Sequence, residues 1–266
     1  MPPVLSIRNA SLGFGSRTLW SALNLDIEAG EFVAMLGPNG SGKSTLLKAI
    51  LWQQSLDSGT IDLLGAPVQR GSKSIGYVPQ QKLLDRGTPI RARDLVSFGV
   101  NGHRWGFPLP SKKVRARVDA VLAEVGATDY ADSPVETLSG GEQQRLRIGQ
   151  AVIAEPSLLL CDEPLISLDL NHQREVSELL DRQRRATGAA VLFVTHDVNP
   201  VLDMVDRVLY LAGGRFSIGT PDQVLRTDVL SELYGTQVEV IRLDGRIIVV
   251  GAPEHHGEHE HAVGVA

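Results

Sequence analysis

The chain has 266 residues, of which 42% are hydrophobic and 21% charged, and its formal net charge is −5. This balance predicts a globular protein with a sizeable core and gives no reason to expect nucleic acid as a partner. The length favours one core with an inserted lobe over two full domains. The single cysteine, Cys161, excludes an intrachain disulfide and fits a reducing compartment. No apolar run approaches the roughly 20 residues of a membrane span, and no signal peptide is evident.

The first 36 residues have the patterns of strands. Apolar and polar residues alternate around Ile7 and again around Leu25, which predicts a half-exposed antiparallel sheet. After a turn at residues 28–31, the continuous apolar run of residues 32–36 predicts a buried parallel strand. We expect this strand to lead into a glycine-rich loop and then into a helix that starts near Lys43.

That loop, residues 37–44, reads GPNGSGKS and matches the pattern G-x-x-x-x-G-K-[ST]. Its glycines let backbone N–H groups approach a phosphate closely, and the following helix adds the positive end of its dipole. Lys43 should reach the β- and γ-phosphates, and Ser44 offers a hydroxyl ligand to Mg²⁺. The alternative is a plain glycine-rich loop with a surface lysine, but the preceding strand favours the phosphate loop. The pattern indicates a P-loop NTPase without choosing its class.

The middle of the chain differs in character from its flanks. Residues 78–133 contain scattered glycines and prolines and then a basic, helix-like run at residues 112–117, which predicts a mainly helical inserted lobe. Strand-like runs return at residues 157–161 and 190–194, with helical patterns between them. Strands that alternate with helices predict a parallel sheet with helices packed against it.

The last part of the chain contains two further patterns. Apolar residues between Val238 and Val250 are divided by the turn Leu243-Asp244-Gly245-Arg246, which predicts a small hairpin. Residues 253–266 are polar and hold four of the seven histidines, so we expect a disordered tail.

The class of NTPase is indicated by residues 138–145, which read LSGGEQQR. Taken alone, this run could be a helix cap with Ser139 at the cap and Glu142 in the first turn. The run resembles the signature sequence of ATP-binding cassette (ABC) ATPases, and the chain resembles the nucleotide-binding domain of an ABC transporter. The resemblance covers roughly residues 4–225.

Two acidic residues follow the apolar run of residues 158–161 and resemble the Walker B motif. The resemblance implies that Asp162 holds Mg²⁺, through a water ligand, and that Glu163 acts as the general base or polarises the attacking water. An Asp-Glu pair at a strand end could also be a solvated turn, but the order of the motifs argues against this.

Three further residues match family motifs. Gln80 resembles the Q-loop glutamine, which contacts Mg²⁺ and the attacking water, and Gln81 is the competing choice. His196 resembles the switch histidine that contacts the γ-phosphate, although a lone histidine at a strand end is more often structural. Asp169 resembles the D-loop aspartate, which communicates across the dimer. Leu165-Ile166-Ser167 stands where the family often has Thr-Ser-Ala, so the apolar Ile166 replaces a hydroxyl.

Phe14 stands at the place of the aromatic residue that stacks on adenine in the family. Its alternative role is that of a core aromatic in the antiparallel sheet. Together with Phe14, the resemblance assigns nucleotide contacts to Gly37, Pro38, Asn39, Gly40, Ser41, Gly42, Lys43, Ser44, Thr45, Ser139, Gly140, Gly141, Glu142 and Asp169. It assigns catalysis to Glu163, His196, Gln80 and Lys43, and Mg²⁺ binding to Ser44, Gln80 and Asp162.

The implied fold is α/β: a P-loop NTPase core with a mainly parallel sheet, an N-terminal antiparallel β subdomain and an inserted α-helical subdomain. We expect an ABC ATPase domain at residues 4–225, with the helical lobe at about 82–150. A helix and β-hairpin extension would follow at residues 226–252, and a His/Glu-rich disordered tail at residues 253–266.

The implied function is ATP hydrolysis, with ATP and Mg²⁺ as cofactors, in a head-to-tail dimer of two copies of the chain. In that dimer the Ser139 turn of one copy closes over the γ-phosphate held by the other. Integral membrane permease subunits would be direct partners, and a substrate-binding protein an indirect one. The chain would lie on the cytoplasmic face of the plasma (inner) membrane.

Two features of the C-terminal region bear on the cargo. Imidazole groups suit transition metals, so His255, His256, His259 and His261 predict weak metal binding by the tail, unless they are incidental to a solvated acidic segment. Residues 230–235 and the valine-rich hairpin resemble the C-terminal end of ATPases from zinc and manganese importers. We therefore expect the chain to serve an importer of a divalent metal ion, zinc or manganese. The alternatives are an iron-chelate importer, a soluble ABC ATPase such as one for iron–sulfur assembly, and a regulatory module without hydrolysis. Glu163 and His196 argue against the last.

Overall fold

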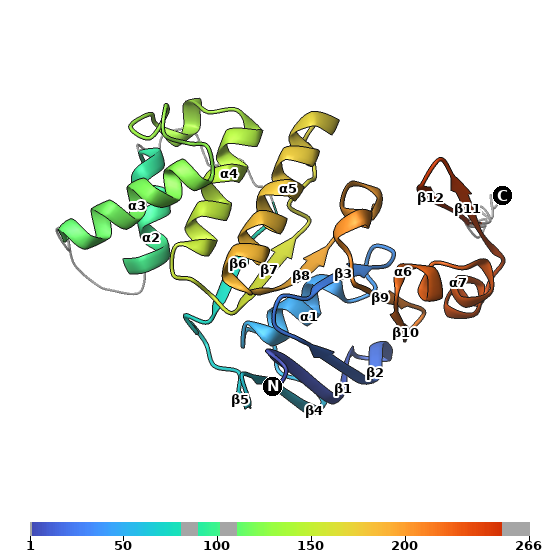
Figure 1. The fold of residues 1–266 in the computed structure, drawn as a ribbon. Coiled ribbons are helices and arrows are strands. Elements are labelled where there is room, and N and C mark those ends of the chain that lie inside the picture. Colours follow the sequence, from blue (N-terminus) through green and yellow to red (C-terminus); the bar gives the residue numbers. More distant parts are fainter. Residues whose placement is uncertain (1, 81–89, 102–110, 252–266) are drawn as a thin grey trace, which may run out of the picture.

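The computed structural model describes residues 2–80, 90–101 and 111–251. Figure 1 shows a central sheet with a group of helices on one side and a small C-terminal extension on the other. The strands are β1 (Leu5–Phe14), β2 (Arg17–Ile27), β3 (Phe32–Leu36), β4 (Ser58–Leu63), β5 (Ala66–Pro67), β6 (Ile75–Val78), β7 (Leu158–Asp162), β8 (Ala190–Val194), β9 (Arg207–Ala212), β10 (Arg215–Gly219), β11 (Val238–Leu243) and β12 (Arg246–Gly251). The helices are α1 (Lys43–Ile50), α2 (Ala92–Asn101), α3 (Lys112–Glu124), α4 (Gly140–Val152), α5 (Leu170–Thr187), α6 (Pro221–Val224) and α7 (Thr227–Tyr234), with 3₁₀ turns η1 (Val135–Thr137) and η2 (Asn199–Met204).

The N-terminal strands form an antiparallel sheet in the order β2-β1-β4-β5. Residues of β1 that are buried, such as Leu5 and Ile7, alternate with more exposed ones, as a sheet with one covered face requires. The sequence prediction of a half-exposed antiparallel sheet is confirmed here.

The central sheet has the order β10-β9-β3-β8-β7-β6, and its strands are parallel except for the edge strand β10. Every residue of β3, β7 and β8 is buried because both faces of the sheet are covered. Alternate residues of β8 pack into two separate hydrophobic cores. Phe193 packs with α5, whereas Leu192 packs with α1 and the N-terminal sheet. The predicted mainly parallel sheet with helices is confirmed. Helix α1 packs in the second of these cores through four residues, Leu46, Leu47, Ala49 and Ile50.

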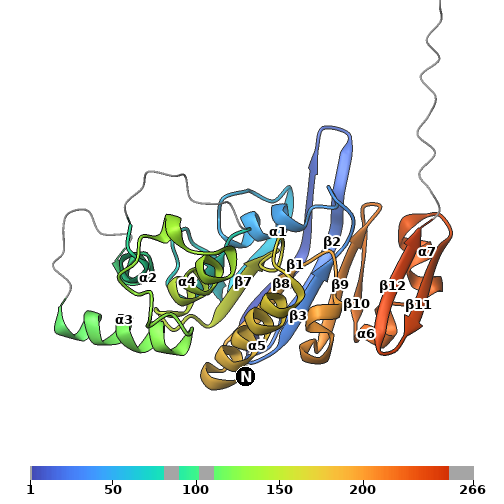
Figure 2. The same ribbon diagram turned by 90° about the horizontal axis from the view of Figure 1, so that it is seen from above.

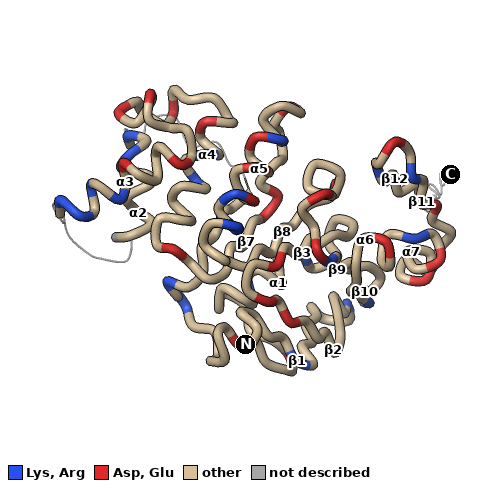
Figure 3. The backbone as a smooth tube through the Cα atoms, in the orientation of Figure 1, with Lys and Arg blue, Asp and Glu red and all other residues tan. Residues whose placement is uncertain are grey.

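The inserted region carries α2, α3, η1 and α4 between β6 and β7. Helix α2 packs on α4, and Figure 2 shows these helices at one end of the molecule. Basic residues are concentrated in the first half of α3, as Figure 3 shows, which places the predicted basic run on a helix.

The C-terminal extension lies at the opposite end, where α6 and α7 precede a separate two-stranded sheet of β11 and β12 (Figure 2). The strands pair across the turn at Asp244-Gly245, with Leu243 opposite Arg246, as the sequence pattern predicted. The hydroxyl groups of Tyr210 in β9 and Tyr234 in α7 lie 2.9 Å apart and tie the extension to the core. Within the described ranges, no helix has the length and hydrophobicity needed to cross a lipid bilayer.

Candidate functional site

The glycine-rich loop follows β3 and wraps around the start of α1. Gly37, Gly40 and Gly42 have φ angles of 143°, 76° and 99°, a region in which residues with a Cβ are strained. A Cβ on Gly37 would lie 2.1 Å from the carbonyl oxygen of Leu211, so this position also lacks space for a side chain. Gly42 caps α1, and no side chain of the described residues accepts a hydrogen bond there. The N–H groups of this turn are therefore not satisfied by a capping side chain, as a phosphate-binding turn requires.

Lys43 is buried beneath the loop. Its Nζ donates to the carbonyl oxygens of Gly37 at 2.6 Å and Pro38 at 3.0 Å, so the ammonium group lies within the turn. Burial lowers the pKa of Lys43, and the nearby carboxylates of Glu163 and Asp162 oppose that change. The result is a positive charge positioned close to backbone donors, which suits a polyanion.

Asp162 ends β7 directly beside α1. The Ser44 hydroxyl lies 3.4 Å from Asp162 Oδ1, and the Tyr77 hydroxyl lies 3.4 Å from Oδ2. Burial, with a contribution from Glu163, raises the pKa of Asp162. Burial and Asp162 also raise the pKa of Tyr77 to about 12. A hydroxyl and a carboxylate side by side provide the oxygen ligands that Mg²⁺ prefers, so this donor set fits the ion that the sequence predicts.

Glu163, Gln80 and His196 come from neighbouring strand ends. Because β7 and β8 run parallel with Asp162 opposite Val194, the residues after them emerge at the same edge of the sheet. Gln80, just after β6, donates from Nε2 to Glu163 Oε2 at 3.2 Å. Glu163 has a φ of 46°, a strained value for a residue with a side chain, and its N–H donates to the carbonyl oxygen of Val194 at 3.0 Å.

These residues share one cavity of about 730 Å³, which falls in the range of small-molecule sites. Its described lining joins the phosphate loop to both sheets and consists of Phe14, Arg17, Leu19, Asn39, Gly40, Gly42, Lys43, Ser44, Thr45, Gln80, Glu163, Ile166 and His196. Phe14, at the end of β1, is 55% exposed, so the alternative of a core aromatic is wrong. The structure thus brings together most of the residues that were predicted for one copy of the chain.

The serine–glycine turn before α4 lies elsewhere. Ser139 caps the helix in a capping box: its N–H and Oγ donate to Glu142 Oε2 at 2.8 and 2.7 Å, and Glu142 N–H lies 3.3 Å from Ser139 Oγ. These hydrogen bonds lower the pKa of Glu142. The cap that the sequence allowed is present, and neither Ser139, Gly140, Gly141 nor Glu142 is among the described residues that line the cavity.

Asp169 also lies outside the cavity lining, as the N-cap of α5. Its carboxylate accepts from the N–H of His172 at 3.0 Å and lies 2.6 Å from His172 Nδ1, and these contacts lower its pKa. The nearby Ile166, which departs from the family pattern, reaches the cavity wall.

Neither Arg17 nor Tyr77 was predicted from the sequence as a residue of the site. Arg17 lines the cavity and donates from Nη2 to the carbonyl oxygen of Gly40 at 2.9 Å. The sequence could have indicated Arg17 as a site residue, because a two-residue turn places it opposite Phe14. The sequence does not indicate the role of Tyr77, since its contact with Asp162 depends on the pairing of β6 with β7.

The four histidines predicted to bind transition metals, at 255, 256, 259 and 261, lie outside the described residues, as does Gln81. Among the residues that are described, no group of three or more His, Cys, Asp and Glu side chains could hold such an ion.

Known proteins resemble the chain in sequence and in fold. The family model described as "ABC transporter" matches residues 20–166. The chain is 38% identical to the phosphonates import ATP-binding protein PhnC of Caulobacter vibrioides, over 91% of this chain and 97% of that protein. It is 33% identical to the iron(3+)-hydroxamate import ATP-binding protein FhuC of Bacillus subtilis, covering 89% and 90%, and 30% identical to the zinc import ATP-binding protein ZnuC of Pseudomonas fluorescens, covering 97% and 88%.

Among solved structures, cbiO1 from Clostridium perfringens, part of the ABC transporter complex cbiONQ, superimposes with a TM-score of 0.74 at 27% identity, covering 87% of this chain and 94% of that one. An inward-facing ABC transporter assigned to the metal-chelate type gives a TM-score of 0.78 at 27% identity, covering 96% and 98%. These similarities concern the nucleotide-binding chain and do not single out one cargo.

Proposed function

Because the chain belongs to the ABC transporter family of ATP-binding proteins, we propose that it is the ATP-binding and ATP-hydrolysing subunit of an importer. The observation that carries this proposal is the convergence of Lys43, Gln80, Glu163 and His196 on one cavity. The relatives named above, all import ATP-binding proteins, support the direction of transport.

In the proposed mechanism the phosphates of ATP lie against the glycine loop and the start of α1. Backbone N–H groups and the Lys43 ammonium stabilise their negative charge, and Phe14 stacks on the base. Ser44, Asp162 and Gln80 would hold Mg²⁺, which when bound neutralises charge on the phosphate oxygens.

Glu163 then accepts the proton of the attacking water. Gln80 is positioned to orient that water because its amide is already hydrogen-bonded to the Glu163 carboxylate. His196 faces the same space from the end of β8 and would contact the γ-phosphate. Phosphoryl transfer to water depends mainly on positioning and charge neutralisation, which these groups provide without a covalent intermediate.

The Ser139 turn would act on the nucleotide of a second copy. Since it does not line its own chain's cavity, a head-to-tail dimer gives it a role that one chain cannot. Two ATP molecules would favour the closed dimer, and hydrolysis would remove that preference. The helical group α2–α4 would pass the motion to permease subunits at the cytoplasmic face of the inner membrane, with a substrate-binding protein as indirect partner.

For the cargo we propose a divalent metal ion, zinc or manganese. The support is the group of four histidines in residues 253–266 together with the zinc-named relative. The iron-hydroxamate relative and the metal-chelate structure favour an iron chelate as the second candidate. Zinc titration of the full chain, compared with a variant in which the four histidines are alanine, tests the tail. Equal binding by both chains would remove this support for a metal cargo.

The central test of hydrolysis is Glu163→Gln. We expect the variant to bind ATP normally, to lose at least about 10²-fold in turnover and to accumulate as an ATP-bound dimer, since binding persists without a general base. Glu232→Gln, at an exposed position of α7, is the matched control and should turn over normally. Wild-type turnover by Glu163→Gln would remove Glu163 from its role.

The transport assignment needs a separate measurement. We expect the chain to co-purify with a polytopic membrane protein from its native host, and the identity of that protein would also indicate the cargo. Recovery with iron–sulfur assembly proteins, and with no membrane protein, would favour the soluble ATPase instead.

A further inference from the structure

The loop that carries His196 is closed by side-chain hydrogen bonds on both sides of the histidine. The Thr195 hydroxyl donates to the carbonyl oxygen of Asp197 at 2.7 Å and accepts from its N–H at 3.2 Å. One carboxylate oxygen of Asp197, Oδ1, accepts from the backbone N–H of Asn199 at 2.9 Å and from its Nδ2 at 2.7 Å. The exposed His196 side chain therefore projects from a turn whose shape depends on Thr195 and Asn199.

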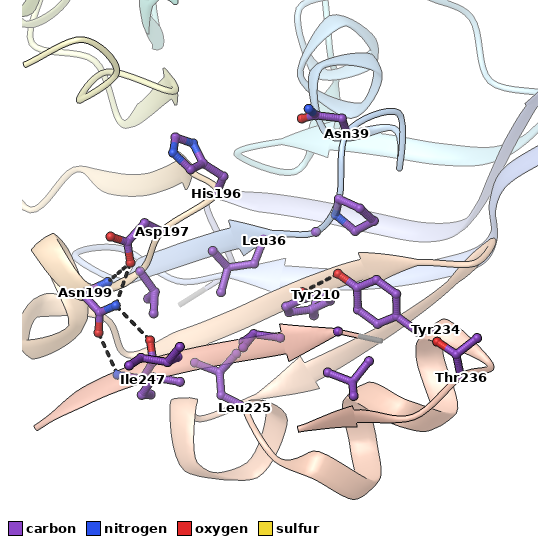
Figure 4. A pocket seen from close by; sticks show the side chains of 17 residues that line it. Leu36, Asn39, His196, Asp197, Asn199, Tyr210, Leu225, Tyr234, Thr236 and Ile247 are labelled. Carbon is purple, nitrogen blue, oxygen red and sulfur yellow. Dashed lines mark hydrogen bonds between the residues drawn. The ribbon is translucent and has the colours of Figure 1, made fainter. Parts of the chain in front are cut away.

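The same Asn199 amide reaches the C-terminal hairpin, as Figure 4 shows. Its Nδ2 donates to the carbonyl oxygen of Ile247 at 2.9 Å, and its Oδ1 accepts from the Ile247 N–H at 2.8 Å. Two hydrogen bonds to the same backbone residue fix both the position and the orientation of the amide. Because Ile247 is buried, this contact lies under the hairpin and not on its exposed side.

The rest of the hairpin is held by the extension itself. Val238 bonds to Ser231, Val240 N–H donates to Thr227 Oγ1 at 3.0 Å, and Arg242 pairs with Asp222 at 2.8 Å. In the part of the chain that the structure describes, both hydrogen bonds from the hairpin to residues before α6 are made by Asn199. The position of the hairpin relative to the ATP-binding core is thus linked directly to the loop of His196.

A cavity of about 790 Å³ lies beside this link. Asn39 of the phosphate loop and His196 line one side, while Tyr234 and Thr236 line the other (Figure 4). Over this part of its surface the hairpin is not packed tightly against the phosphate loop. The Asn199 amide is therefore a specific connection across a loosely filled region.

We propose that Asn199 is a positioning residue for ATP hydrolysis, through which the β11–β12 hairpin fixes the His196 loop. This inference rests on the proposed function, because it requires His196 to act on the nucleotide. Without the link to Ile247, the turn at residues 195–199 is no longer held against the hairpin, and His196 spends less time at the γ-phosphate. The glycine loop and Lys43 are untouched, so ATP affinity is retained and only turnover falls.

The test is a double-mutant cycle in the full chain, with kcat and KM for ATP as readouts. Asn199→Ala removes the amide, and Ile247→Pro removes the N–H that binds it from the hairpin side. The Ile247 N–H points away from β11, so proline at this position breaks no hydrogen bond between the two strands. We expect each variant to lower kcat about tenfold with KM within about twofold, and the double variant to be no worse than either single one.

Two controls match these changes. Asn24→Ala removes an asparagine that likewise joins two backbone segments, through Asn9 and Ala22, but lies on the N-terminal sheet, and it should leave kcat unchanged. Ile247→Val trims the same buried side chain as Ile247→Pro while keeping the N–H, and should also turn over normally.

The outcomes separate this inference from the function on which it rests. If His196→Ala loses turnover while Asn199→Ala and Ile247→Pro keep wild-type kcat, the positioning role is wrong and the ATPase assignment stands. If His196→Ala turns over normally, the role of His196 in the proposed function fails. Losses that multiply in the double variant would show two separate effects and would also overturn the link. Should Asn199→Ala not fold, Ile247→Pro against Ile247→Val tests the same connection alone.

Discussion

The chain contains two glycine-rich turns that each lead into a helix, and the two turns differ in how the N-terminus of that helix is capped. The turn before α1 has three glycines at positive φ and no capping side chain among the described residues. The turn before α4 is closed by the capping box of Ser139 and Glu142. Lys43 is buried inside the first turn, whereas the second turn has its own carboxylate at the helix N-terminus.

This difference indicates how far each turn is prepared for phosphate. The first already presents uncapped N–H groups and a buried cation, so we expect a single chain to bind a nucleotide. In the second turn, the Glu142 carboxylate already accepts hydrogen bonds from the N–H and the hydroxyl of Ser139, two donors that a phosphate could use. We infer that the second turn binds phosphate only in the dimer, where the partner's nucleotide competes with Glu142 for those donors.

The largest expected contrast is between Gly37→Ala and Gly141→Ala. A Cβ at Gly37 would meet the Leu211 backbone oxygen at 2.1 Å, and the φ of 143° is strained for alanine. We expect this variant to lose ATP binding altogether, because neither the backbone of β9 nor that of the loop can shift to make room for the methyl group. A Cβ at Gly141 would meet the His172 ring at 2.7 Å, which a side-chain rotation relieves.

Gly141→Ala should therefore keep single-chain ATP affinity and fail only in the dimer-dependent step. Fluorescent ATP-analogue binding at low protein concentration, together with thermal unfolding, measures both effects. Equal losses of affinity in the two variants would contradict the separation of the turns.

Lys43→Ala should have the next largest effect. Hydrogen bonds to charged groups contribute about 1.5–3 kcal/mol, so removing the ammonium predicts a loss of ATP affinity of about 10²-fold. Lys48→Ala, at an exposed position of the same helix, is the matched control and should bind ATP normally. Unchanged affinity in Lys43→Ala, measured by calorimetry, would count against the phosphate-loop assignment.

The sequence predicted those parts of the fold that depend on local pattern. The continuous apolar runs of β3, β7 and β8 follow from burial on both faces, and alternation in β1 follows from burial on one. The Ser139–Glu142 cap was also predictable, since its partners are three residues apart. The convergence of Lys43 with Glu163 was foreseen through family resemblance, because no local pattern relates strands so far apart in the chain.

What could not be predicted depends on strand register and side-chain reach. Tyr77 meets Asp162 only because β6 pairs with β7, and Asn199 meets Ile247 across 48 residues through the placement of the hairpin. The exposure of Phe14 was likewise undecided, because an aromatic residue in an alternating strand suits either face. Each case involves contacts between elements, which composition and periodicity do not predict.

The smallest expected difference between the turns is in their response to acid. Hydrogen bonds from Ser139 hold the pKa of Glu142 below its usual value of 4.5. Since the folded pKa is the lower one, this stabilisation is complete above pH 4.5 and is lost as pH falls through the folded value.

At neutral pH, Ser139→Ala should lower the free energy of unfolding by about 1 kcal/mol, as loss of an N-cap does. Ser41→Ala is the matched control, because in the described structure the buried Ser41 hydroxyl has no hydrogen-bond partner. Urea unfolding at pH 7 and pH 3 should show the gap between wild type and Ser139→Ala narrowing in acid, while the gap for Ser41→Ala stays constant. A Ser139→Ala gap of equal size at both pH values would mean that the hydrogen bond from the Ser139 hydroxyl to the Glu142 carboxylate does not stabilise the second turn.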